Sequence, residues 1–183
     1  KMKVFVLALL AIFALSHELN FKNYFSQKAP NWKGKAVIGH EFKDVSLITL
    51  DSSDDYKGKY LVLLFYPFDF TYVCPTEIIA FSNAAKELKA LNTEIVALSV
   101  DSHFTHLAWK KIPRADGGLG DLDIPLLSDF SKQIQELLGS IEDPKDDLYG
   151  ASLRGLFIID GNQKIRTIQI NDAPVGRDVG EVV

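Results

Sequence analysis

The residue best suited to covalent chemistry in this sequence is Cys74, the single cysteine among 183 residues. It follows Pro67 and Thr71 in the spacing Pro-x-x-x-Thr-x-x-Cys. A thiol reacts as its thiolate, and a free cysteine is mostly protonated at neutral pH. A nucleophilic Cys74 therefore requires a helix N-terminus, a hydrogen-bond donor or a cation beside its sulfur. The alternative interpretation is an inert thiol in the core.

The sequence around Cys74 predicts a strand followed by a helix. Residues 60–66 are apolar on both faces, as in a central parallel strand, and Pro67 ends the run. From 75 to 91 apolar side chains recur at helical spacing, and Glu77 lies near the positive end of the helix dipole. We therefore expect Cys74 to cap this helix, where unpaired amides favour a charged sulfur. A threonine hydroxyl one turn earlier and a proline without an N–H would complete the pocket.

The rest of the chain predicts one α/β domain, with a mixed central β-sheet flanked by helices. A hairpin is expected over residues 36–47, and an antiparallel hairpin over 153–170 closes the domain. Between the hairpins, strands alternate with helices. We expect further strands at 94–100 and 124–127, and further helices at 104–111 and 131–138.

The first residues have the pattern of a secretory signal peptide. Two lysines flank Met2, an uninterrupted apolar run covers residues 4–15, and the run is too short to span a membrane. We predict a signal peptide over 1–16, an extended arm over 17–35 and the domain over 36–183. The pattern therefore predicts the secretory pathway, either the endoplasmic reticulum or the extracellular space, and no membrane contact after signal removal. The alternative is a buried N-terminal helix.

Composition and spacing argue against two other classes of function. The formal charge of −4 and the lack of a long basic cluster disfavour nucleic acid as a partner. His103 and His106 are three residues apart with no third ligand nearby, so we favour packing over a metal site. A single thiol forms no disulfide within the chain. In an oxidising compartment such a thiol is reactive, paired between chains or buried.

Several segments, in order, resemble the peroxiredoxins of the typical two-cysteine subgroup, and the apolar leader points to its secretory-pathway member. The match runs from about Pro30 to Arg177. It implies a thioredoxin-like fold, and reduction of hydrogen peroxide or an organic hydroperoxide with no metal or other cofactor. The segments that carry the resemblance are 65–77, 100–109, 117–120, 124–129, 153–160 and 171–177.

The resemblance also implies a role for each site residue. Cys74 would be the peroxidatic nucleophile that becomes a sulfenic acid, with Thr71 bonding thiolate and substrate and Pro67 shielding the pocket. Arg154 would stabilise the sulfur anion and the leaving oxygen, although an arginine in an apolar strand is also explained by a surface salt bridge. Glu77 and Arg177 would hold Arg154 in place. By itself, Glu77 is equally well explained as a first-turn residue.

The implied partners are a peroxide, an external thiol reductant (a thioredoxin-like protein or a small thiol) and a second copy of the chain. A homodimer is expected, often closed into a decamer. The sequence departs from the subgroup because it has no second cysteine and stops soon after Arg177. We therefore expect a truncated product, with a natural one-cysteine peroxidase as the alternative. Residues 139–151 also exceed the family pattern.

Two other function classes stay open. A non-catalytic holdase chaperone or a secreted signalling protein can use the same fold, because fold does not determine function. A thioredoxin-type disulfide oxidoreductase is disfavoured, because Glu77 stands where a Cys-x-x-Cys motif needs its second thiol.

Overall fold

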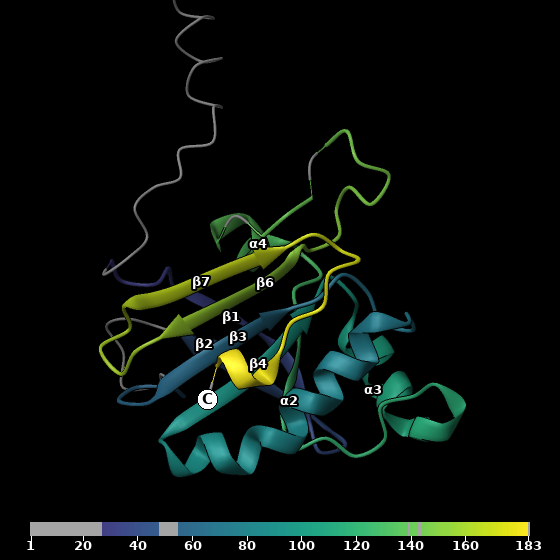
Figure 1. Cartoon of the computed structure of the whole chain (residues 1–183), viewed down its shortest axis with the longest axis horizontal. Helices are drawn as coiled ribbons and strands as arrows, with labels where there is room; N and C mark the ends of the chain where they lie inside the picture. Colours follow the sequence, from purple (N-terminus) through teal and green to yellow (C-terminus); the bar gives the residue numbers. More distant parts are fainter. Residues whose placement is uncertain (1–26, 48–54, 139, 143, 183) are drawn as a thin grey trace, which may run out of the picture.

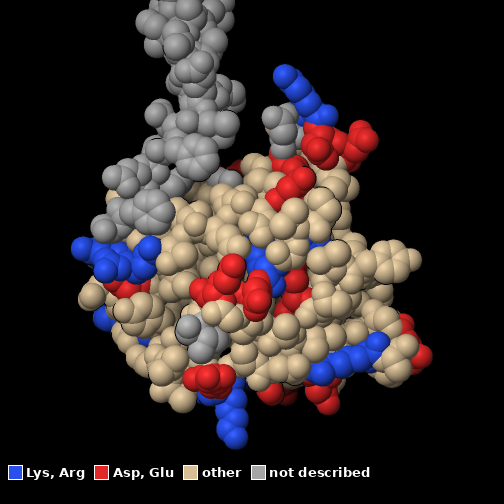
Figure 2. All heavy atoms as spheres, viewed as in Figure 1, with Lys and Arg blue, Asp and Glu red and all other residues tan. Residues whose placement is uncertain are grey.

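The computed structural model describes residues 27–47, 55–138, 140–142 and 144–182. The predicted signal peptide over 1–16 and the arm up to residue 26 lie outside the described residues. Within the described ranges, no helix is long and apolar enough to cross a membrane. On the face shown in Figure 2, lysine and arginine side chains are scattered among other residues and form no continuous basic stripe.

The helices and strands alternate through the middle of the chain, as the hydrophobic pattern predicts. In chain order they are β1 Trp32–Ile38, β2 Glu41–Leu47, β3 Tyr60–Phe65, α2 Val73–Ala90, β4 Thr93–Ser99, α3 His103–Lys111, η1 Arg114–Asp116, β5 Leu126–Ser128, α4 Gln133–Leu138, β6 Arg154–Ile159, β7 Ile165–Asn171 and η2 Val179–Glu181.

Among the described residues, seven strands form one mixed sheet in the order β2-β1-β5-β4-β3-β6-β7 (Figure 1). The three central strands β3, β4 and β5 are parallel, as expected for strands joined by helical crossovers. The outer pairs β1–β2 and β6–β7 are antiparallel hairpins. The predicted mixed α/β architecture, a thioredoxin-like fold, is therefore confirmed.

Alternate residues of β3 face opposite sides of the sheet, and each side has its own core. Leu61 and Leu63 pack into the cluster that also contains Ile134 of α4. Val62 and Leu64 pack into the cluster that contains residues of α2 and α3. Because helices cover both faces, β3 is apolar throughout, as the sequence indicates.

Two predicted boundaries are wrong. β1 begins at Trp32, so the last four residues of the predicted arm belong to the sheet, where Lys35 pairs with Ser128 of β5. This pairing joins segments far apart in the sequence, which local pattern does not reveal. The helix begins at Val73, with Tyr72 at the N-cap, so Cys74 lies in the first turn and is not the cap. A proline is tolerated anywhere in the first turn, because those amides lack helical partners, and it therefore does not mark the first residue.

Candidate active site

Cys74 lies where the chain passes from the carboxyl end of β3 into the first turn of α2. Its side chain is fully buried among residues of the core between α2 and the sheet. Nη1 of Arg154, at the start of β6, lies 3.5 Å from the Cys74 sulfur. The structure thus joins two residues separated by 80 positions in the sequence.

Glu77 joins two arginines beside the sulfur. Its Oε2 accepts from Nη1 of Arg154 at 2.5 Å. Its Oε1 accepts from the backbone N–H and the Nε of Arg177, at 2.7 and 2.9 Å. Burial lowers the pKa of Arg177 from its ordinary value, and the hydrogen bond to Glu77 opposes that shift. We call Cys74, Glu77, Arg154 and Arg177 the arginine cluster; all four side chains are buried.

Backbone carbonyls complete the coordination of the two guanidinium groups. Nε of Arg154 donates to the carbonyl of Ala173. Nη1 of Arg177 donates to the carbonyl of Gly155 at 2.6 Å. The arginines are therefore held by one carboxylate and by two backbone carbonyls, one in β6 and one just after β7, a geometry that suits the fixed fork of a guanidinium.

The loop between β3 and α2 contains Pro67 and Thr71. Pro67 is buried and Thr71 is half-buried. The Thr71 hydroxyl donates to the carbonyl of Phe68 at 3.0 Å, within its own loop. The structure thus places Thr71 near the site but directs its proton to the backbone. Phe70 has a φ of 57°, which is unusual for an aromatic residue, and its ring lies 5.6 Å from that of Trp109.

A second buried polar group, which sequence reasoning missed, lies beneath this loop. The Asp69 carboxylate accepts from Tyr66 Oη at 2.8 Å, and its other oxygen lies 2.8 Å from Nδ1 of His106. Nε2 of His106 lies 3.2 Å from the carbonyl of Leu127. We call Tyr66, Asp69 and His106 the loop triad. An aspartate in the middle of an apolar segment was the sequence signal for it, because a buried carboxylate needs partners.

Burial raises the pKa of both acidic groups in the loop triad. Desolvation raises the pKa of Asp69, and the hydrogen bond from His106 partly opposes it. Desolvation also raises the pKa of Tyr66 well above its ordinary value, with the charge of Asp69 as the next cause. The phenol therefore stays protonated and donates to the carboxylate.

The two histidines considered as metal ligands have separate environments. His106 is fully buried in the loop triad, whereas His103 packs against Phe42 and Phe104, at ring centroid distances of 4.8 and 4.2 Å. In the part of the chain that the structure describes, no group of three or more histidine, cysteine, aspartate or glutamate residues is arranged to hold a metal ion.

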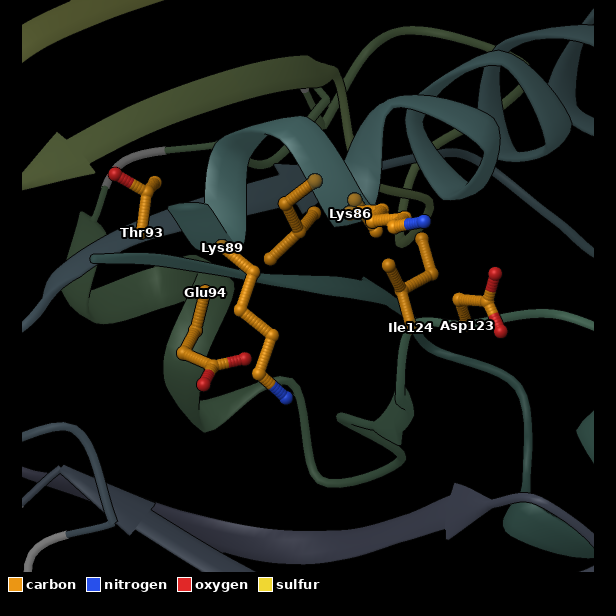
Figure 3. A pocket seen from close by; sticks show the side chains of 8 residues that line it. Lys86, Lys89, Thr93, Glu94, Asp123 and Ile124 are labelled. Carbon is orange, nitrogen blue, oxygen red and sulfur yellow. The ribbon is translucent and has the colours of Figure 1, made fainter. Parts of the chain in front are cut away.

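A cavity of about 330 Å³ lies at the other end of α2 (Figure 3). At 1.5 Å per residue, its lining residues Lys86 and Lys89 are about 20 Å along the helix from Cys74. None of the six predicted site residues lines it. The cavity is therefore separate from the arginine cluster.

Sequence comparison finds strong similarity to enzymes named for peroxide reduction. The AhpC/TSA family profile matches residues 25–168. The human "Thioredoxin-dependent peroxide reductase, mitochondrial" is 55% identical over 158 residues, which cover 86% of this chain and 58% of that protein. Rat "Peroxiredoxin-4" is 53% identical over 169 residues, which cover 91% of this chain and 58% of that protein. This chain thus spans just under three fifths of the length of these relatives.

Solved structures show the same fold. Plasmodium vivax 2-Cys peroxiredoxin in its reduced form superposes with a TM-score of 0.79 at 40% identity, covering 87% of this chain and 78% of that one. Enterococcus faecalis AhpC superposes with a TM-score of 0.76 at 31% identity, covering 87% of each chain.

The comparisons overturn the predicted cellular location. Relatives from human, rat and mouse that are 53–55% identical are named as mitochondrial proteins, so the prediction of a secretory location is wrong. A basic and apolar N-terminal pattern is a property of composition, and composition does not by itself identify the compartment.

The family profile covers more than half of the chain, and the curated relatives match it at more than half of the aligned positions. The fold agrees with the family profile and with the curated relatives, and so does the order of the segments along the chain. The chain therefore belongs to the AhpC/TSA family, the peroxiredoxins.

Proposed function

We propose that this chain is a thiol-dependent peroxidase that reduces hydrogen peroxide and organic hydroperoxides at Cys74. The observation that carries the proposal is the 3.5 Å contact between the Cys74 sulfur and the Arg154 guanidinium. The names of the relatives, peroxide reductase and peroxiredoxin, support the same reaction.

The charges of the arginine cluster favour an anionic sulfur. Two guanidinium groups face one carboxylate, that of Glu77, so the buried cluster has one uncompensated positive charge while Cys74 is a thiol. Ionisation of the thiol makes the cluster neutral. Because buried charges are unfavourable unless paired, a thiolate at Cys74 would supply the counter-charge that the second guanidinium lacks.

In the proposed reaction, the thiolate attacks one oxygen of the peroxide. A sulfur–oxygen bond forms, the O–O bond breaks with its electron pair going to the departing oxygen, and that oxygen takes a proton to leave as water or alcohol. Sulfur is oxidised by two electrons to the sulfenic acid, and the peroxide is reduced. Arg154 stabilises the charge on the departing oxygen, while Glu77 and Arg177 hold Arg154.

Pro67 and Thr71 have supporting roles in this proposal. Pro67 has no N–H and is buried at the start of the loop, so it limits water without adding a competing donor. The Thr71 hydroxyl donates to Phe68 in the resting structure, and in the proposal it turns to the peroxide when substrate enters. Since the sulfur is fully buried, substrate entry requires the loop over residues 67–72 to move.

An external thiol returns the enzyme to its starting state. One thiol condenses with the sulfenic acid to a mixed disulfide and releases water, and a second thiol displaces Cys74 and leaves as part of a disulfide. The relatives named thioredoxin-dependent support a thioredoxin-like reductant, with a small thiol as the alternative donor. Membership of the typical two-cysteine subgroup belongs to the same proposal, and the superposition on the Plasmodium vivax 2-Cys peroxiredoxin supports it.

The proposal includes a homodimer that closes into a decamer. β7 forms one edge of the sheet, and an edge strand is a template for pairing with a second chain. Phe104 and Tyr149 are among the large side chains exposed on the surface. Sedimentation velocity at several concentrations measures the assembly directly, and a monomer at every concentration would contradict it.

The test of the reaction is stopped-flow mixing of the reduced protein with hydrogen peroxide. We expect rapid loss of one thiol per chain and a sulfenic acid at Cys74, trapped with dimedone and located by mass spectrometry. Cys74→Ser should remove both signals. A rate no faster than that of free cysteine would rule out the peroxidase function.

A further inference from the structure

The segment between α4 and β6 folds back on itself before the chain reaches Arg154, and Figure 1 shows it projecting between these two elements. The N–H of Leu153 donates to the carbonyl of Ser140 at 3.0 Å. Ile141 and Ser152 form an isolated antiparallel bridge. The two ends of this segment, at Ser140 and Leu153, are therefore hydrogen-bonded to each other immediately before Arg154 in the chain.

Arg154 lies at the centre of a three-residue turn. The N–H of Gly155 donates to the carbonyl of Leu153 at 2.8 Å, the hydrogen bond of a γ-turn. Two serine hydroxyls meet the same carbonyl: Ser140 Oγ lies 3.3 Å and Ser152 Oγ 3.0 Å from it. Ser152 Oγ has one proton and lies nearer to the Ser140 carbonyl, at 2.8 Å, so the carbonyl that closes the turn accepts from the Ser140 hydroxyl.

The two serines form a closed pair. Both are fully buried, their hydroxyl oxygens lie 3.2 Å apart, and Ser152 Oγ donates to the carbonyl of Ser140 at 2.8 Å. Ser140 packs directly against the turn, because a Cβ added to Gly155 would lie 2.4 Å from its Oγ. Buried hydroxyls of this kind hold one geometry, since leaving a donor unpaired is unfavourable.

The turn is fastened on its other side by the arginine cluster. The Gly155 carbonyl accepts from Arg177, and the Arg154 side chain extends from the turn to Glu77 and Cys74. The position of the guanidinium over the sulfur therefore depends on the backbone that the serines hold. A displacement of about 1 Å at a reacting group is sufficient to cost a factor of about 100 in rate.

We propose that Ser140 and Ser152 are positioning residues for the peroxidase reaction: their hydroxyls fix the turn at Leu153–Gly155 and so aim Arg154 at Cys74. The inference rests on the proposed peroxidase function. It assigns a role in the reaction to two residues at the ends of the segment between α4 and β6. Neither serine touches the substrate; both act through Arg154.

The first experiment compares the double variant Ser140→Ala/Ser152→Ala with the matched control Ser82→Ala. Ser82 is also buried, and its Oγ accepts from the N–H of Asp123 at 2.8 Å, away from Arg154. The rate constant with hydrogen peroxide should fall about tenfold in the double variant, which corresponds to the loss of roughly one buried hydrogen bond. In the control it should stay within about twofold of wild type. Thermal denaturation of each variant confirms that it is folded at the assay temperature.

The second experiment separates positioning from general stability. In the background Arg154→Lys, which keeps the charge but loses the fork, the serine substitutions should cause no further loss of rate. If the serine substitutions lower the rate by the same factor in wild type and in Arg154→Lys, the inference is overturned.

The outcomes separate this inference from the proposed function. A wild-type protein no faster than free cysteine overturns both. A fast wild type with an equally fast double variant overturns the positioning role alone. A fast wild type, a slow double variant and no further effect in the Arg154→Lys background support it.

Discussion

The arginine cluster, which contains Cys74, and the loop triad, which includes Asp69 of the preceding loop, are both buried polar groups, but their charges differ. The arginine cluster has two cations for one carboxylate, whereas the loop triad pairs one carboxylate with a phenol and an imidazole. The arginine cluster therefore has a net positive charge, which a thiolate at Cys74 would neutralise. The loop triad satisfies its own members and connects the loop to α3 and β5. The net positive charge of the arginine cluster suits a reacting anion, whereas the internally paired loop triad suits a structural role.

Removal of the carboxylate from the arginine cluster should have the largest effect. Glu77→Gln leaves two buried guanidinium groups without an anion, so we expect a loss of about 3–5 kcal/mol in the free energy of unfolding. Urea denaturation measures it. The matched control is Glu94→Gln, whose half-buried partner Lys59 lies 3.2 Å away, and it should lose about 1 kcal/mol or less. Equal losses would mean that the cluster is not distinct from a surface pair.

Removal of Arg154, the cation that contacts the sulfur, should lower the rate of reaction with peroxide. Arg154→Ala should lower the rate constant with hydrogen peroxide by about 100- to 1,000-fold, the effect typical of losing one preorganised donor to a developing negative charge. Arg166→Ala, an exposed arginine on β7, is the control and should react like wild type. Stopped-flow kinetics decides the matter, and a rate within threefold of wild type for Arg154→Ala would contradict the proposed role.

The stability of the loop triad should depend on the shape and hydrogen bonding of the side chain at position 69 more than on its negative charge. Asp69→Ala leaves Tyr66 and His106 without their shared acceptor, and we expect a loss of about 1–3 kcal/mol in stability. Asp69→Asn should lose much less, because the amide oxygen accepts from Tyr66 while the amide nitrogen donates to a neutral His106. Urea denaturation of the two variants side by side tests this. If both lose the same amount, the negative charge itself is what the triad requires.

The smallest effect should be a pH dependence of the triad. Burial raises the pKa of Asp69 in the folded protein, so the folded state binds this proton more tightly than the unfolded state does. The contribution of Asp69 to stability is therefore fully present below the unfolded value, near 3.9, and is lost as pH rises through the raised folded value. The stability difference between wild type and Asp69→Asn, measured from pH 4 to 7, should shift against wild type as pH increases. A shift in the opposite direction would contradict the raised pKa of Asp69.

Much of the site is predictable because its residues lie in segments that resemble a known family. The sequence identifies Cys74, Glu77, Arg154 and Arg177 as candidates, and the structure brings all four together. The resemblance also implies that Thr71 bonds the thiolate and the substrate, and in this structure its hydroxyl donates to the carbonyl of Phe68 in its own loop. The orientation of a hydroxyl depends on local backbone geometry, which residue spacing does not specify.

Residue types and periodicity by themselves determined the alternation of strands and helices and the burial of β3 on both faces, and they made Cys74 a candidate nucleophile. These are local properties, because they follow from patterns within a few turns of chain. Only the tertiary structure decided that Asp69 meets His106, 37 positions away, and that Ser140 closes on Leu153, in front of Arg154. Such contacts depend on how the elements pack, and packing joins residues whose sequence separation carries no signal.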